Sequence, residues 1–183
     1  KSLFERAVEA SRWLNRIEPE RIDRVLLSVA DAAERRSDDI LAANREDLAR
    51  KDPSDPMYDR LQLTPERITG IAADMRNVAS LPSPLGLTLD ERMRPNGMTI
   101  RKVSVPFGVI GVIYEARPNV GFDVFSLCLK AGSACVLKGG SDAIDSNTAI
   151  TESIRRSLTE AGACADAIQL ITDTDRETTS RFM

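Results

Sequence analysis

Two short polar stretches, each placed directly after an apolar run, carry the residue types that could do chemistry. The first is EARPN, residues 115–119, after VIGVIY, and the second is KGGS, residues 138–141, after ACVL. Short apolar runs of this kind are typical of strands buried on both faces of a parallel sheet. Ligands of such sheets bind in the crevice beyond the carboxyl ends of the strands, where the strand order reverses. The spacing therefore predicts that both stretches face one ligand.

The residue types in these stretches suit a nucleotide. Glycines let the backbone come close to a ligand, the start of the next helix offers free N–H groups, and a lysine supplies a positive charge for phosphate. We therefore expect a dinucleotide cofactor. The residues expected to contact it are Glu115, Arg117, Pro118, Lys138, Gly139, Gly140 and Ser141.

The same residues also have plainer explanations. Lys138, which precedes two glycines, could be a solvated side chain in a tight turn. This explanation accounts for a lysine at that position as well as ligand binding does. Asn119 could cap the helix that follows it, and its spacing alone favours the cap. In KGGS the glycines follow the lysine, which excludes the P-loop motif, and the motif G-x-G-x-x-G is missing.

The chain has no histidine, and the spacing of its three cysteines matches no zinc site or disulfide framework, which excludes several kinds of site. A chain without histidine has no Ser-His-Asp triad and no histidine-ligated metal. Cys128, Cys135 and Cys164 lack the C-x-x-C spacing of a zinc site and any disulfide framework. Cys128 and Cys135 fit a buried core and Cys164 fits a loop, so we expect no metal and no cysteine nucleophile among them.

The elements that must position these stretches follow from apolar periodicity. Helical spacing runs over 2–14, 19 to about 35, 40–48 and 65–80, with a break near Ser37 and Asp38. Alternating residues around Pro95-Asn96-Gly97 predict a hairpin whose turn takes positive φ angles from Asn-Gly. After residue 106 the order is strand, helix, strand, helix, strand, with a further helix beginning in 173–182. This order predicts an α/β fold with a doubly wound parallel sheet.

The bulk composition narrows the class of protein. The chain has 183 residues, 42% hydrophobic content and a net charge of -3 with both signs interspersed. No basic field exists to draw nucleic acid or an anionic membrane, and no apolar run approaches the ~20 residues of a membrane span. We therefore expect a cytoplasmic protein with a small-molecule partner, and the abrupt end at Met183 suggests a part of a longer chain.

One long run of the sequence resembles a known family. VPFGVIGVIYEARPNVGFDVFSLCLKAGSACVLKGGSDAIDSN is similar to the signature region of gamma-glutamyl phosphate reductase, also called glutamate-5-semialdehyde dehydrogenase. LAANREDLA, DRLQLTPERI, RPNGMTIRKVSVPFG and QLITDTDRE also resemble stretches of that family, so the similarity covers nearly the whole chain.

The resemblance implies a fold and a reaction. The fold is that of the aldehyde dehydrogenases, and the reaction is the NADPH-dependent reduction of L-glutamyl 5-phosphate to L-glutamate 5-semialdehyde, with release of phosphate, in proline biosynthesis. In this family a cysteine forms a thioacyl intermediate that accepts the hydride. No cysteine of this chain matches its motif, so the nucleophile is expected beyond Met183. A homo-oligomer and glutamate 5-kinase are the implied protein partners.

The resemblance also implies roles for individual residues and regions. In aldehyde dehydrogenases the lysine that ends this strand, here Lys138, binds the adenosine ribose, although this reductase family often has arginine there. An acidic residue commonly follows three positions later, where this chain has Ser141, and a serine favours the 2′-phosphate of NADPH because a carboxylate would repel it. Asn119 matches an oxyanion-stabilising asparagine and is the candidate catalytic residue.

The implied regions are an amino-terminal helical region at 1–84, a hairpin at 85–105 that is a candidate oligomerisation element, and the first part of the NADPH-binding sheet at 106–183. The domain with the catalytic cysteine is absent. Two other functions stay open, namely a non-catalytic nucleotide-binding or assembly module and a different acyl-reducing dehydrogenase of the same superfamily.

Overall fold

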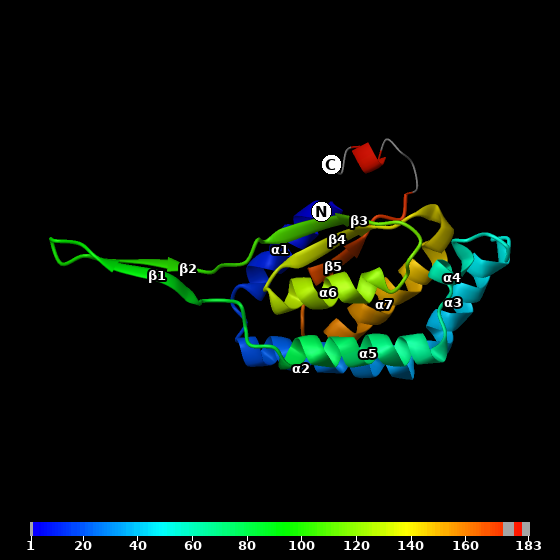
Figure 1. Ribbon diagram of the computed structural model, residues 1–183, viewed down its shortest axis with the longest axis horizontal. Helices are drawn as coiled ribbons and strands as arrows, with labels where there is room; N and C mark the ends of the chain where they lie inside the picture. The colour runs from blue at the N-terminus through cyan, green and yellow to red at the C-terminus, as the bar shows by residue number, and fades with distance from the viewer. Residues whose placement is uncertain (1, 174–177, 181–183) are drawn as a thin grey trace.

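The computed structural model describes residues 2–173 and 178–180 and contains a parallel sheet between helical layers (Figure 1). The amino-terminal helices are α1 (Leu3–Leu14), α2 (Pro19–Arg35), α3 (Ser37–Ala49), α4 (Tyr58–Leu61) and α5 (Pro65–Ser80). Their starts follow local sequence signals. Ser2 and Glu5 form a capping box at α1, and Thr64 caps α5 ahead of Pro65. The short α4 was not predicted, because four residues carry no periodic pattern.

The sheet has three described strands in the order β3-β4-β5, all parallel. They are β3 (Val109–Ile113), β4 (Ala134–Lys138) and β5 (Ile168–Leu170), and the crossovers contain α6 (Val120–Lys130) and α7 (Ile144–Glu160). Short 3₁₀ turns, η1 (Ser141–Ala143) and η2 (Ala165–Ala167), precede α7 and β5. The predicted α/β fold with a parallel sheet is confirmed.

The helices cover both faces of the sheet (Figure 1). α1 packs on one face, against β4, while α6 and α7 pack on the other face. α2 and α5 form a further layer below α6 and α7, and α3 packs along α7. The core between these layers is apolar, with Leu26, Met75, Phe122, Phe125 and Ile154 fully buried.

The central strand β4 is buried at every position, as its apolar run predicts. The same prediction for β3 is wrong, since β3 is only partly buried and Ile113 is 47% exposed. β3 lies at an edge of the three described strands, with β4 as its partner on one side. Burial of an apolar strand depends on such neighbours, which periodicity does not reveal.

The hairpin is an antiparallel pair, β1 (Thr88–Met93) and β2 (Thr99–Val103), that projects from the body (Figure 1). The prediction that Asn96 takes a positive φ is wrong: among the described residues only glycines do, and in this turn it is Gly97, at φ 81°. Pro95 suits the first central position of an ordinary turn, so Asn96 follows in the right-handed region and Gly97 alone reverses the chain. Gly97 N donates to Arg94 O at 2.9 Å.

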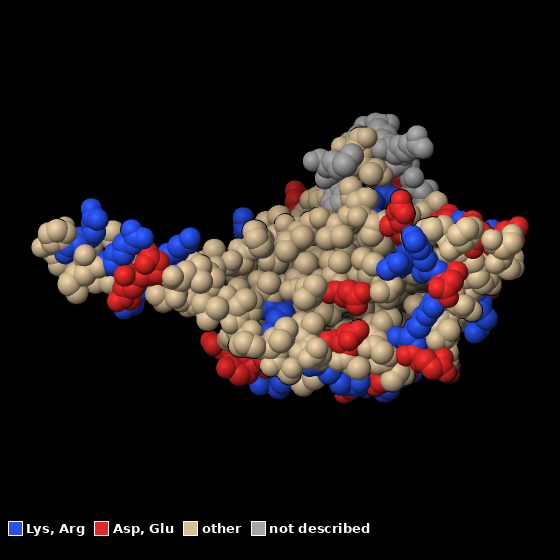
Figure 2. Space-filling model, viewed as in Figure 1, with Lys and Arg blue, Asp and Glu red and all other residues tan. Residues whose placement is uncertain are grey.

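Both signs of charge are interspersed on the face shown in Figure 2, with Lys and Arg beside Asp and Glu at the end where α3 and α4 lie. In the described part of the chain, no helix combines the length and the apolar character needed to cross a bilayer. The further helix predicted within 173–182 falls mostly on residues outside those described.

Candidate functional site

The two polar stretches meet at neighbouring strand ends. Tyr114 N, just past β3, donates to Lys138 O at 3.1 Å, and Gly140 N donates to Glu115 O at 3.4 Å. A side chain at Gly140 would have its Cβ only 3.5 Å from the Glu115 carbonyl. The order of the described strands does not reverse, so the adjacency of β3 and β4, rather than a switch point, brings these loops together.

Lys138 is a buried lysine that has no anionic partner in the described part of the chain. It is 5% exposed, and its Nζ donates to Gly139 O at 3.2 Å. No carboxylate of the described residues lies within ion-pairing distance of it. Lys130, which is equally buried, donates to the Asp23 carboxylate and to Ala79 O at 2.9 Å. Because a buried charge is costly unless it is paired, Lys138 fits a site that receives an anion.

Gly139 lies against buried polar atoms that lack partners. A Cβ at Gly139 would collide with Asn147 Nδ2 and would lie 3.3 Å from Tyr114 Cζ. Both amide atoms of Asn147 and the Tyr114 hydroxyl are buried and make no hydrogen bond with the described residues. Burial raises the pKa of Tyr114, so its hydroxyl remains a donor. Unsatisfied polar atoms beside a glycine loop are what a site for a polar ligand or an ordered water would show.

Ser141 is exposed at the start of η1, next to an ion pair that comes from a distant loop. Lys51 Nζ lies 2.7 Å from an oxygen of Asp142 and 3.1 Å from one of Asp55. The two carboxylates raise the pKa of Lys51, which keeps it charged. The carboxylate beside Ser141 is therefore neutralised by a cation.

Asn119 stands at the position before α6, but it does not cap the helix. Its backbone is already helical, at φ -56° and ψ -28°, and its side chain makes no capping hydrogen bond. A capping side chain needs an extended backbone at that position. Instead, Asn119 Nδ2 donates to Asp123 Oδ2 at 2.9 Å. The prediction that Asn119 caps this helix, which its spacing favoured, is thus wrong. The second amide hydrogen of Asn119 has no acceptor among the described residues.

Arg117 and Asn119 open onto a cleft that does not include Lys138. This cleft, of about 340 Å³, lies between the α4–α5 region and the loop before α6. A smaller cleft of about 240 Å³ is lined by Glu115, Arg117 and Arg60, together with Tyr114. Pro118 is buried. The predicted site residues therefore form two groups, one around Lys138 and one around Arg117.

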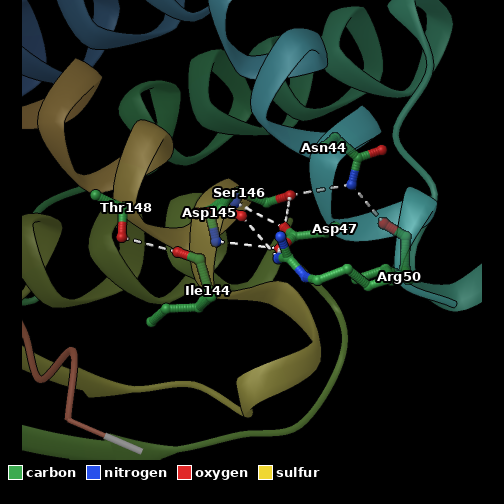
Figure 3. A network of polar contacts seen from close by, with 8 residues as sticks. Asn44, Asp47, Arg50, Ile144, Asp145, Ser146 and Thr148 are labelled. Carbon is green, nitrogen blue, oxygen red and sulfur yellow. Dashed lines mark hydrogen bonds and ion pairs between the residues drawn. The ribbon is translucent and has the colours of Figure 1, made fainter.

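A network of polar contacts fastens α3 to the start of α7, directly after the lysine loop (Figure 3). Asp47 accepts from Ser146 N at 2.8 Å, from Ser146 Oγ at 2.5 Å and from Asp145 N at 3.2 Å. α7 has no side-chain cap from its own first residues, so Asp47 supplies one from another helix. Asn44 Nδ2 donates to Ser146 Oγ at 3.0 Å and to Leu61 O at 2.9 Å.

Sequence reasoning missed the residues that support the site. Asn147, Asp47, Lys51 and Asp123 were not singled out. Asn44 falls on the apolar stripe of its helix, and a polar residue on such a stripe is a signal of a buried network. The others carry no local signal, because their partners come from distant parts of the chain.

Comparison with known proteins gives a consistent family. No family model matches the chain. A gamma-glutamyl phosphate reductase of Bacteroides thetaiotaomicron is 57% identical over 174 residues, which are 95% of this chain and 42% of that protein. The corresponding reductase of Parabacteroides distasonis is 52% identical over 183 residues, covering the whole chain and 44% of that protein. The chain thus spans less than half the length of these curated relatives.

Solved structures agree with the sequences. The crystal structure of a gamma-glutamyl phosphate reductase from Thermotoga maritima superposes with a TM-score of 0.93 at 34% identity, over 100% of this chain and 45% of that one. A probable aldehyde dehydrogenase from Listeria monocytogenes has a TM-score of 0.76 at 16% identity, over 98% of this chain and 37% of that one, which shows a shared fold. By sequence and by fold, the chain's homologues are gamma-glutamyl phosphate reductases, of which it matches less than half the length.

Proposed function

We propose that the complete protein containing this chain reduces L-glutamyl 5-phosphate to L-glutamate 5-semialdehyde with NADPH and releases phosphate. The observation that carries the cofactor part of the proposal is the buried ammonium of Lys138, which has no carboxylate partner among the described residues. The names of the relatives support the reaction. The thiol that forms the acyl intermediate is supplied by residues outside these 183. The complete protein is a homo-oligomer, in which the projecting hairpin β1–β2 contacts a second copy.

The residues present fit the adenosine end of a dinucleotide. Lys138 and Ser141 would hold the 2′-phosphate and ribose, while Gly139 and Gly140 keep the loop free of side chains. Glu115 and Pro118 belong to the adjoining loop and would orient the rest of the cofactor. Asn119 would donate its free amide hydrogen to the oxygen on which negative charge develops. When bound, NADPH supplies the hydride.

Replacing Lys138 with methionine tests the cofactor site. Methionine keeps the apolar stem and removes the charge, so the complete protein should fold and bind NADPH at least about tenfold more weakly, as the loss of one charge-assisted hydrogen bond predicts. NADH binding should fall less, because NADH lacks the 2′-phosphate. Calorimetric titration with both cofactors measures the difference, and Lys102→Met, on the exposed hairpin, is the control. Equal losses for NADPH and NADH would remove the phosphate assignment.

The reaction itself is checked in the oxidative direction. The complete protein should form NADPH from NADP⁺ only when L-glutamate 5-semialdehyde and inorganic phosphate are both present. Cofactor binding without this activity would favour a nucleotide-binding or assembly module. Activity with a different acyl substrate alone would favour another acyl-reducing dehydrogenase.

Replacing Lys51 with methionine should weaken NADPH binding about threefold and leave NADH binding unchanged. Without Lys51, the Asp142 carboxylate next to Ser141 would repel a 2′-phosphate with its full charge. Adding Asp142→Asn to Lys51→Met should restore the affinity for NADPH, since it removes the repelling charge. Titration of the single and double variants measures both effects, and a double variant as weak as Lys51→Met would contradict the explanation.

A further inference from the structure

The cleft beside Arg117 and Asn119 has the size and the polar lining of a small-metabolite site. Its volume of about 340 Å³ lies at the lower end of the range for ligand pockets. Leu63 and Ile71 form an apolar part of its wall, and most of the other lining residues carry charged side chains of both signs. It is separate from the loop around Lys138, so the cofactor assigned to that loop leaves this cleft free.

Two carboxylates at or beside this cleft interact electrostatically and have no cation partner among the described residues. Asp74, on α5, lines the cleft, and Asp123, on α6, is bonded to Asn119, which also lines it. Burial raises the pKa of Asp123, and the nearby Asp74 carboxylate raises it further, against the hydrogen bond from Asn119. No lysine or arginine among the described residues lies within ion-pairing distance of either carboxylate. Such a pair favours an added positive charge.

Two arginines of the same cleft have no anionic partner among the described residues. Arg60 and Arg117 both line it, and within the described ranges neither guanidinium makes an ion pair or a hydrogen bond. The third arginine, Arg67, is occupied, because it binds the Asp59 carboxylate at 2.8 Å and the carbonyl oxygens of Asp59 and Gln62. The cleft therefore offers a carboxylate pair and two unpaired guanidiniums that do not neutralise each other.

A ligand that satisfies both groups must carry an ammonium and a carboxylate a few bonds apart. We propose that this cleft binds the α-amino-acid end of the substrate, with Asp74 and Asp123 at the α-ammonium and Arg60 and Arg117 at the α-carboxylate. Arginine holds a carboxylate through two parallel hydrogen bonds, which suits the latter role. The assignment rests on the proposed function and adds what selects an amino acid over an unsubstituted acyl chain.

The test compares ligands that differ only in the amino group. L-glutamate and glutarate are titrated calorimetrically into the complete protein, which needs no catalysis. The wild-type protein should bind L-glutamate at least about tenfold more tightly, and the variant Asp74→Asn with Asp123→Asn should lose that preference while its affinity for glutarate changes less than about twofold. Arg60→Met should weaken the binding of L-glutamate and of glutarate equally, because both ligands carry the carboxylate.

Activity provides a second readout with its own control. In the oxidative direction, Asp74→Asn should raise KM for L-glutamate 5-semialdehyde at least about tenfold and leave KM for 5-oxopentanoate, which has no amino group, within about twofold. NADP⁺ binding should be unchanged. Glu66→Gln, exposed in the first turn of the same helix, should alter neither.

Equal changes for both aldehydes, or a wild-type protein that binds L-glutamate and glutarate alike, would overturn the inference. Failure of the proposed function looks different, since the protein would then oxidise neither aldehyde while the titration still reports on the cleft.

Discussion

Replacing Asp47 with alanine should lower the free energy of unfolding by about 4 kcal/mol, because it removes a buried carboxylate from a network of hydrogen bonds. The Asp47 side chain is fully buried and accepts hydrogen bonds from two backbone N–H groups and one hydroxyl at the start of α7. Alanine leaves these buried donors without an acceptor. It also removes one of the two carboxylate partners of Arg50, whose Nη2 lies 2.5 Å from Asp47 Oδ1 and 2.7 Å from Asp145 Oδ2.

Urea unfolding followed by the fluorescence of Trp13, the single tryptophan, measures this effect. Asp47→Asn keeps the shape and one acceptor oxygen, so about half of the loss should remain. Glu46→Ala, the exposed neighbour on α3, should change the free energy of unfolding by less than about 0.5 kcal/mol. Equal midpoints for the Asp47 and Glu46 variants would show that the network contributes nothing.

The Asp47 network matters for function because of its position. It holds Asp145 and Ser146, a few residues after Ser141, and Lys51 of the loop that follows α3 holds Asp142. The loop that carries the proposed cofactor residues is thus fixed at β4 on one side and against α3 on the other. A protein that lost this support would keep Lys138 but not the geometry of Ser141.

What the sequence predicted well was set by local chemistry. Two helix ends were predicted because residues adjacent in the chain determine them. α5 starts at Thr64-Pro65, and α6 ends before Gly132, which takes a φ of 66°. An apolar run in the sequence predicted the buried strand β4, and the lysine that interrupts this run marks the end of the strand.

What the sequence did not predict depends on distant partners. Asp47 and Ser146 are 99 residues apart, and nothing in either segment indicates the other. Asn119 has the type and spacing of a cap, yet its helical backbone turns the side chain to Asp123. The exposure of β3 follows from which strands stand beside it. Residue types in the sequence were thus sufficient to locate the loops of the site. The contacts that shape these loops could be identified only from the folded structure.

Replacing Gly139 with alanine weakens NADPH binding at least about tenfold, because the added methyl group has no room. Its Cβ would lie closer to Asn147 Nδ2 than 3.0 Å, a limit that real Cβ atoms essentially never cross with a non-neighbouring atom. Asn147 is 1% exposed and cannot swing into solvent, so the loop must move, as overpacked sites do. Gly140→Ala separates this collision from a general need for glycine in the loop, since its Cβ would meet nothing closer than 3.5 Å and its φ of -69° suits alanine.

The collision at Gly139 also predicts its own rescue. Adding Asn147→Ala removes the atoms that the new methyl group meets, and it leaves no buried partner unpaired, because the amide of Asn147 makes no hydrogen bond with the described residues. NADPH affinity of the double variant, measured by calorimetric titration, should return to within about threefold of the affinity of Asn147→Ala alone. If Gly139→Ala and Gly140→Ala lose affinity equally, or if the double variant stays as weak as Gly139→Ala, the loss does not come from this contact. A rescue would instead mean that the lysine loop requires Gly139 for the close approach of α7, so that the packing beneath the loop determines where Lys138 presents its charge.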